Sequence, residues 1–308
     1  MKFLQVLISA LPLLMYTQSA LSEYLEAPQE APVSPASLTE IFLFDLLIEG
    51  DTVSISNVVN TTKRMGYDNQ PYFTPDSTTF LYSREQDSVV DVFEYVLATA
   101  EHRQVTDGAN TEYSPTPSAD NASMLFVSDR NGSVWRAQRS APNAPSWLMQ
   151  ASDNREPIGY FAFNDKTQDF LYWSRYGFSI KLVNQSTSTY HFVAGNTPPA
   201  TPHLIPQTDN FSFVHRQLNE QVVIKMIDPT TLSVTPLLSI VGDNHDYTWS
   251  QDQRIFMIQN NVLFQSKPFE NGTMQAVADL SEFGIKGAGR LSISPNSKHL
   301  AVVGMVAN

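Results

Sequence analysis

The chain has 308 residues, a formal net charge of −12 and a pI near 4.8, and it contains no cysteine. Because it is acidic and has no cluster of Lys and Arg, we expect no nucleic-acid partner. The lack of cysteine excludes disulfide bridges, thiolate metal sites and a cysteine nucleophile. Stability must therefore come from a buried apolar core, for which the chain is long enough.

The first 22 residues are typical of an export signal. Lys2 precedes an apolar stretch over 3–16, and small residues follow up to position 22. The stretch is too short to cross a bilayer comfortably, so a cleaved signal is favoured over an anchor. Residues 23–39 are rich in Pro and Glu and are interpreted as a lead-in. No later stretch is long enough to span a membrane, so we expect a periplasmic or secreted protein, and a monomer.

From residue 40 onward one pattern repeats six times: an apolar run, a polar turn built on Pro, Asp, Asn or Ser, and a second apolar run. Residues 72–83 and 291–303 are its clearest copies. The turns are marked by Asp76, Asp120, Asp165, Asp209, Asp252 and Asn296, in steps of 44, 45, 44, 43 and 44 residues. A period in the forties with four short strands per unit predicts an all-β fold, a six-bladed β-propeller over residues 40–308.

The order of the strand pairs predicts how the ring closes. An extra pair, 41–47 and 53–58, precedes the first repeat, and the last repeat is not followed by an outer pair. The N-terminal strands are therefore expected to complete the last blade non-covalently, which removes the exposed sheet edges of an open array.

Two segments resemble the repeats of TolB-type (WD40-like) propellers. Residues 124–135 match that family's strand, Ser-Asp-Arg-x-Gly and second strand, and residues 69–77 match its aromatic strand and Pro-Asp turn. The usual glycine of this turn is replaced by Ser77, and by Ser297 in the last blade. TolB itself carries an α/β domain before the propeller, whereas this chain has only the lead-in at that place. The resemblance implies a TolB-like propeller of the cell envelope.

Polar residues at the entrances of the innermost strands are the candidate binding site. Loops from six blades meet at one mouth of the central tunnel, which is the usual ligand site of such a ring. The candidate rim residues are Gln70, Glu112, Glu156, His203, His245, Asp246 and Arg290.

The leading hypothesis is a non-enzymatic scaffold without a cofactor, which holds an envelope protein or a peptide at this mouth. His203 and His245 occupy nearly equivalent places in adjacent blades and leave a second hypothesis open. With nearby carboxylates they could hold a divalent metal in a lyase-type or lactonase-type enzyme acting on a carbohydrate or lactone. A third hypothesis is an accessory or sensor domain whose partner docks on the blade edges.

Overall fold

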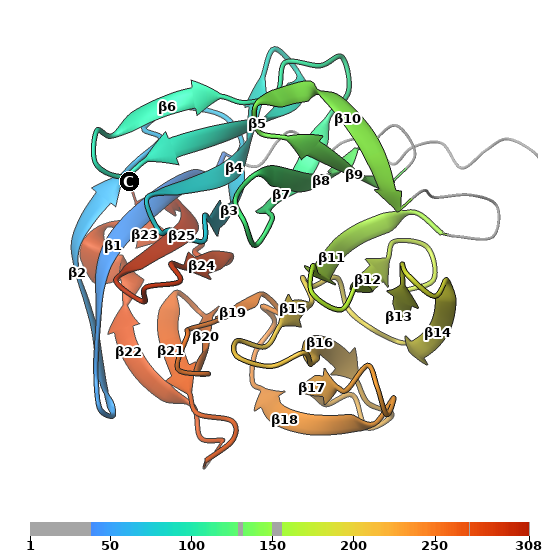
Figure 1. The fold of residues 1–308 in the computed structure, drawn as a ribbon. Coiled ribbons are helices and arrows are strands. Elements are labelled where there is room, and N and C mark those ends of the chain that lie inside the picture. The colour runs from blue at the N-terminus through green and yellow to red at the C-terminus, as the bar shows by residue number, and fades with distance from the viewer. Residues whose placement is uncertain (1–37, 129–131, 150–155, 271, 308) are drawn as a thin grey trace, which may run out of the picture. The chain divides into compact units, whose positions relative to one another are not determined.

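The computed structural model of the protein describes residues 38–128, 132–149, 156–270 and 272–307. They form an all-β six-bladed propeller, in which six antiparallel sheets surround a central axis (Figure 1). The predicted export signal and most of the lead-in lie outside the described residues. Within the described ranges, no helix is long and apolar enough to cross a membrane.

Five blades consist of four strands that are consecutive in the chain, and the first strand of each lies nearest the centre (Figure 1). The strands of the first two are β3 (Asp68–Phe73), β4 (Thr79–Gln86), β5 (Val89–Val96) and β6 (Glu101–Gln104), then β7 (Glu112–Pro117), β8 (Ser123–Ser128), β9 (Ser133–Gln138) and β10 (Ala141–Met149). The strands of the next three are β11 (Ile158–Asn164), β12 (Asp169–Ser174), β13 (Ser179–Asn184) and β14 (Thr189–Ala194), β15 (His203–Leu204), β16 (Phe211–Arg216), β17 (Val222–Ile227) and β18 (Val234–Ile240), and β19 (Tyr247–Trp249), β20 (Ile255–Gln259), β21 (Val262–Ser266) and β22 (Gln275–Asp279).

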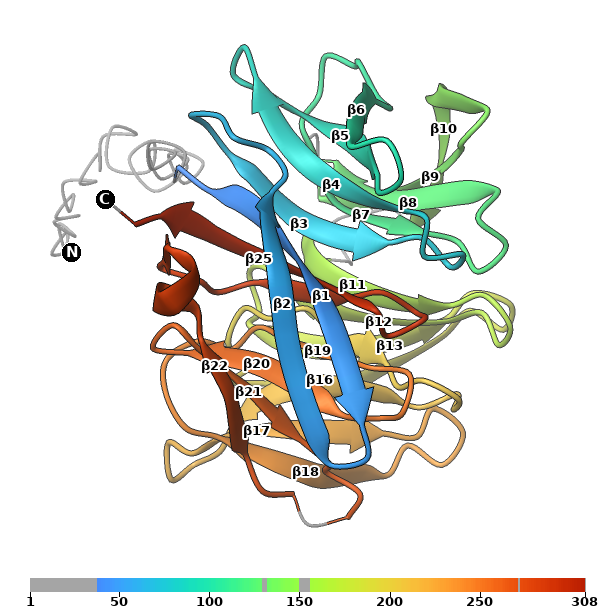
Figure 2. The same ribbon diagram turned by 90° about the vertical axis from the view of Figure 1, so that its left-hand side faces the viewer.

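The sixth blade joins the two ends of the propeller, as the sequence predicts (Figure 2). The N-terminal strand β1 pairs antiparallel with the C-terminal strand β25, so that Ile41 lies opposite Val303. A short 3-10 helix, η1 (Leu280–Phe283), leads into this blade from blade 5. The strands of the sixth blade are β1 (Glu40–Glu49), β2 (Thr52–Asn60), β23 (Ile285–Lys286), β24 (Leu291–Ile293) and β25 (His299–Val306).

The apolar core of the described residues is divided among the spaces between neighbouring blades. Six clusters of buried side chains each combine residues of two adjacent blades. In one of them Ile41 and Val303 of blade 6 pack with Phe73, Phe80 and Tyr82 of blade 1. Because each blade covers the apolar faces of two others, no blade can bury its own residues without the closed ring.

The repeated turns between the first two strands of each blade form a second ring of contacts. Each of the six turns bonds to the turn of the next blade, and these bonds connect positions 43–47 residues apart, or 219 apart where the ring closes. They join Asn121 to Asp76, Ala119 N–H to Asp165, Lys166 to Asp209, Gln253 to the Pro206 carbonyl, Gln251 N–H to Ser297, and Asn296 N–H to Ser77.

Two serines in this ring occupy the place of the glycine in the TolB-type turn. Ser77 and Ser297 have φ angles of 60° and 55°, in the left-handed region that favours glycine. The Ser77 hydroxyl accepts a hydrogen bond from Asn296 N–H at 3.0 Å, and that of Ser297 accepts one from Gln251 N–H at 3.4 Å. The hydroxyl groups thus connect blades, which a glycine could not do.

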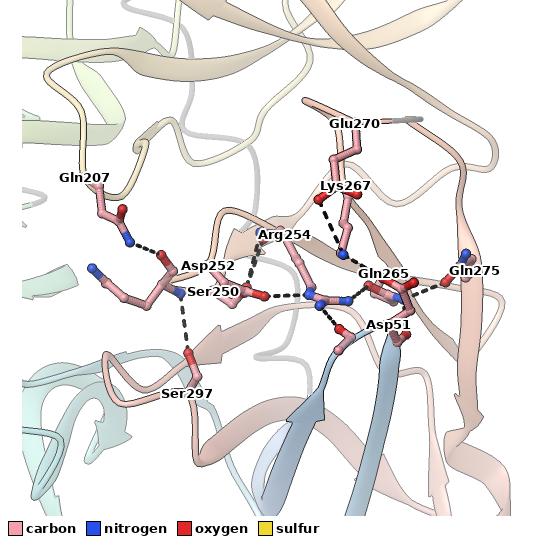
Figure 3. A network of polar contacts seen from close by, with 12 residues as sticks. Asp51, Gln207, Ser250, Asp252, Arg254, Gln265, Lys267, Glu270, Gln275 and Ser297 are labelled. Carbon is pink, nitrogen blue, oxygen red and sulfur yellow. Dashed lines mark hydrogen bonds and ion pairs between the residues drawn. The ribbon is translucent and has the colours of Figure 1, made fainter.

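The hairpin between β1 and β2 is also held by polar contacts with blade 5 (Figure 3). Arg254 is 3% exposed and donates to the carbonyl of Gly50, to Asp252 and to Gln265. Lys267 pairs with the carboxylate of Asp51 at 2.6 Å. The closing hairpin is therefore fixed at its tip by a neighbouring blade, in addition to its pairing with β25.

Candidate functional site

A cavity of about 190 Å³ lies among the innermost strands of the propeller. All six blades contribute to its wall, so it occupies the central tunnel. Apolar side chains such as Phe161 and Leu291 alternate with polar ones. The polar residues that carry the argument below are Gln70, Ser114, His203, Asp246 and Arg290.

The repeat places these polar residues at one level of the tunnel. Ser114 follows Gln70 by 44 positions, and Arg290 follows Asp246 by 44 positions. Gln70 and Ser114 each lie where the pairing of their strand with the next shifts in register, with φ angles of 57° and 55°. Such a bulge changes the direction of the strand and re-aims its side chains.

Gln70 joins the first two blades at this level. Its side-chain oxygen accepts hydrogen bonds from Ser114 N–H at 2.7 Å and from the hydroxyl of Ser83 at 3.0 Å. The Ser114 hydroxyl is buried and has no hydrogen-bond partner among the described residues. The two hydrogen bonds to its oxygen thus fix the orientation of the Gln70 side chain. The Ser114 hydroxyl is available to bond to a ligand.

Arg290 of blade 6 contacts residues of blades 5, 1 and 3. It pairs with the Asp246 carboxylate at 3.5 Å, and it donates to Asn69 at 3.4 Å and to the Tyr160 hydroxyl at 3.2 Å. Its guanidinium also lies over the Tyr160 ring, 5.2 Å from the centroid. Burial opposes the charge of Arg290, but Asp246, Tyr160 and Tyr67 outweigh it and raise its pKa. The group therefore stays cationic.

His203 contributes a neutral imidazole to the cavity. Burial lowers its pKa to about 4, against the opposing effect of the Asp246 carboxylate. Its ring contacts Tyr247 edge to face, with centroids 4.7 Å apart, and its Nε2 atom is buried without a hydrogen-bond partner among the described residues. At pH 7 this nitrogen can donate or accept one hydrogen bond, depending on the tautomer.

The structure divides the seven predicted rim residues into two groups. Gln70, His203, Asp246 and Arg290 line the cavity, whereas Glu112, Glu156 and His245 do not. Glu112 is 7% exposed and accepts a hydrogen bond from Thr106 at 2.6 Å. Glu156 pairs with Lys181 at 2.8 Å and accepts a bond from Ser174, and these donors lower its pKa.

The repeat explains this division. Glu112 and Glu156 are 44 positions apart and equivalent to the buried Asp68, which pairs with Arg84 at 2.7 Å. Each lies two residues before the repeat position that Gln70 and Ser114 occupy, on the other side of the bulge. Their carboxylates therefore bond to donors within the blades and not to groups in the cavity. His245 is one position away from Asp246, and burial lowers its pKa, with Arg216 acting in the same direction.

The pair of histidines does not form a metal site in the described part of the chain. His203 lines the cavity and His245 does not. No group of three or more His, Cys, Asp or Glu residues in the described ranges could hold a metal ion. The described residues therefore do not fit the divalent metal that the second hypothesis requires.

Three residues of this region were not predicted: Ser114 lines the cavity, Tyr160 bonds to Arg290, and Tyr67 acts on the charge of Arg290. Ser114 could have been found from the spacing of 44 residues to Gln70. Tyr160 lies in a strand where an aromatic ring is expected for packing, and its ring does lie against that of Trp173, with centroids 5.8 Å apart and the planes tilted by 37°. Nothing in the sequence indicates that its hydroxyl also reaches Arg290, because the two are 130 positions apart.

The fold and the site define a six-bladed β-propeller with a small polar cavity in its tunnel. A TolB-type protein of Agrobacterium tumefaciens has a TM-score of 0.65 at 13% identity, over 86% of this chain and 97% of that one. A gluconolactonase from Xanthomonas campestris has a TM-score of 0.62 at 8% sequence identity, over 88% of this chain and 99% of that one. An oligogalacturonate lyase in complex with manganese has a TM-score of 0.52 at 14% sequence identity, over 89% of this chain and 99% of that one. No family model and no curated protein matches the sequence, so these similarities establish the fold alone.

Proposed function

We propose that the chain is an exported, monomeric binding scaffold of the cell envelope, which holds a peptide segment of a partner protein in its central cavity. The observation that carries this proposal is the gathering of unpartnered polar atoms at the cavity. Ser114 Oγ and His203 Nε2 are buried without hydrogen bonds among the described residues, Arg290 Nε has only the long ion pair with Asp246 at 3.5 Å, and all three residues line it. Buried polar groups without partners are costly, so a ligand that bonds to them gains affinity.

The size of the cavity supports a peptide over an oligosaccharide. Sites for small molecules usually enclose about 300–1,000 Å³, whereas this one encloses about 190 Å³. That volume accepts one or two side chains of a larger partner. The similarity to TolB agrees with an envelope protein, and residues 1–22 support export.

Panning of a random peptide library on the purified chain tests the proposal. We expect peptides that lose binding in Thr201→Trp, which fills the cavity, and keep it in Thr235→Trp. Thr201 lines the cavity and Thr235 is exposed on the outer strand β18 of the same blade. Peptides with the opposite sensitivity would move the site to the blade edges, and a screen without binders would contradict peptide binding.

Cell fractionation tests the location. The full-length protein should be recovered from the periplasm or the medium with the N-terminal segment removed. A chain that stays in the cytoplasm with residues 1–22 intact would contradict export.

A further inference from the structure

Arg290 is held more loosely than the partly or fully buried Arg84, Arg136 and Arg254. Charge-assisted hydrogen bonds normally have lengths of about 2.7–2.9 Å. The contacts of Arg290 with Asn69, Tyr160 and Asp246 measure 3.2–3.5 Å. Its side chain is 19% exposed. By contrast, Arg84, Arg136 and Arg254 each have a carboxylate oxygen at 2.7–2.8 Å.

The carboxylate of Asp246 is held as loosely as the guanidinium of Arg290. Its side chain is 22% exposed, and the 3.5 Å pair with Arg290 is the one polar contact of its carboxylate found among the described residues. Asp246 and Arg290 therefore present a strong acceptor and a strong donor side by side in the wall of the cavity. Both groups can bond to a ligand without breaking a short bond in the protein.

The charges of the cavity cancel. Asp246 and Arg290 are the charged residues of its wall, and His203 is neutral at pH 7 because burial lowers its pKa. A carboxylate entering the cavity meets the repulsion of Asp246, and an ammonium group meets that of Arg290. Neither charge recovers its cost of desolvation in a site of zero net charge.

A neutral amide fits both groups at once. Its oxygen accepts hydrogen bonds, as the guanidinium requires, and its N–H donates, as the carboxylate requires. The Ser114 hydroxyl and His203 Nε2 can satisfy what remains of its polar atoms. The volume of about 190 Å³ admits an amide side chain, and Phe161 and Leu291 can contact its methylene groups.

We infer that the central cavity recognises a neutral amide of its peptide ligand, an Asn or Gln side chain or a peptide bond, between Arg290 and Asp246. This inference rests on the proposed function, because it names the group of the peptide that enters the tunnel.

Binding of small probes, measured by ligand-observed NMR at pH 7, tests the inference. Propionamide, propionate and propylammonium have the same three-carbon chain and a similar size, and they differ in charge. In the wild-type protein propionamide should bind at least threefold more tightly than either ion. Comparison of propionamide with N-methylacetamide, which imitates a peptide bond, identifies the source of the amide.

Two variants should reverse the selectivity in opposite directions. Asp246→Asn leaves Arg290 unopposed and should make propionate the preferred probe, whereas Arg290→Gln should make propylammonium the preferred probe. Asp243→Asn and Lys286→Gln change the net charge equally outside the cavity wall and should leave the order unchanged. Thermal unfolding of each variant verifies that it is folded.

The outcomes separate the inference from the proposed function. Preference of the wild type for an ion, or an unchanged order in both cavity variants, rejects the amide. If peptides sensitive to Thr201→Trp are nevertheless found, the peptide-binding scaffold stands with another ligand group. If neither probes nor such peptides bind, both are rejected.

Discussion

Arg254 of blade 5 donates a hydrogen bond to the carbonyl of Gly50, which lies 204 positions earlier in the chain, at the tip of the closing hairpin (Figure 3). The same guanidinium bonds to Asp252 at 2.7 Å and to Gln265 at 3.0 Å. One buried side chain therefore links the first hairpin of the propeller to its fifth blade. Its removal leaves acceptors on both sides without a donor.

We expect Arg254→Ala to lower the free energy of unfolding by about 2–3 kcal/mol. Urea unfolding followed by circular dichroism measures this value. Arg103→Ala is the matched control, because the Arg103–Glu101 pair is 59% exposed at both side chains and such pairs contribute about 0–1 kcal/mol. Equal losses in the two variants would show that the contact with Gly50 has no special role.

Removal of the closing hairpin should unfold the whole propeller. Without residues 40–60 the strand β25 loses its partner β1, and Ile41 is lost from the cluster it shares with Phe73 and Val303. We expect the shortened chain to have no cooperative thermal transition. A cooperative transition at the wild-type temperature would instead show that five and a half blades are sufficient.

Substitutions of Ser77 separate backbone strain from the bond between blades. Ser77→Ala keeps the left-handed backbone and loses the bond from Asn296 N–H, so stability should fall by about 1 kcal/mol. Ser77→Gly loses the same bond but relieves a strain of about 1–2 kcal/mol, so it should be close to neutral or slightly stabilising. Urea midpoints of the two variants measure the difference. A glycine variant less stable than the alanine variant would contradict this assignment.

The sequence predicts the architecture well because the repeat is directly visible in it. The spacing of Asp76, Asp120 and the following turns identifies six blades, and the extra N-terminal pair identifies the closure. The six sheets confirm the number of blades, and the pairing of β1 with β25 confirms the closure. These features depend on local patterns and on their order, which a sequence records.

The site is less predictable because it depends on register and on contacts between distant blades. A difference of two residues separates Gln70 from Asp68 and Ser114 from Glu112, and it decides whether a side chain lines the tunnel or is buried in the blade. The bulges that set this register have no glycine to mark them. The contact of Arg290 with Tyr160 arises only when the ring closes.

His203 should make the protein less stable in acid. Its pKa is about 4 in the folded state and near 6.5 in the unfolded state. Between these values the unfolded chain binds more protons, so stability is lost as the pH falls from 6.5 to 4, by at most about 3 kcal/mol from this residue. His203→Gln should reduce the loss of unfolding free energy between pH 7 and pH 4.

The control for this experiment is His191→Gln, on the outer strand β14. Urea unfolding at both pH values gives the change for each protein, and the carboxylates that titrate in this range are common to all of them. A loss in His203→Gln as large as in the wild type would mean that His203 is protonated without cost in the folded protein.

Glu156 should affect stability and not binding. Its carboxylate is the counterion of Lys181, whose side chain is 9% exposed, while that of Glu156 is 38% exposed. Glu156→Ala leaves the lysine without a partner and should cost about 1–2 kcal/mol, a value reduced by the partial exposure of the pair. Lys181→Met in the same chain should recover most of this loss, because the uncompensated charge is then absent.

The binding of propionamide separates this role from a place on the binding rim. Because Glu156 does not line the cavity, Glu156→Ala and the double variant should bind the probe as the wild type does, in the same NMR titration. Arg290→Gln provides the positive control for lost amide binding. A Glu156→Ala protein of unchanged stability and weakened probe binding would return Glu156 to the rim on which the sequence pattern first placed it.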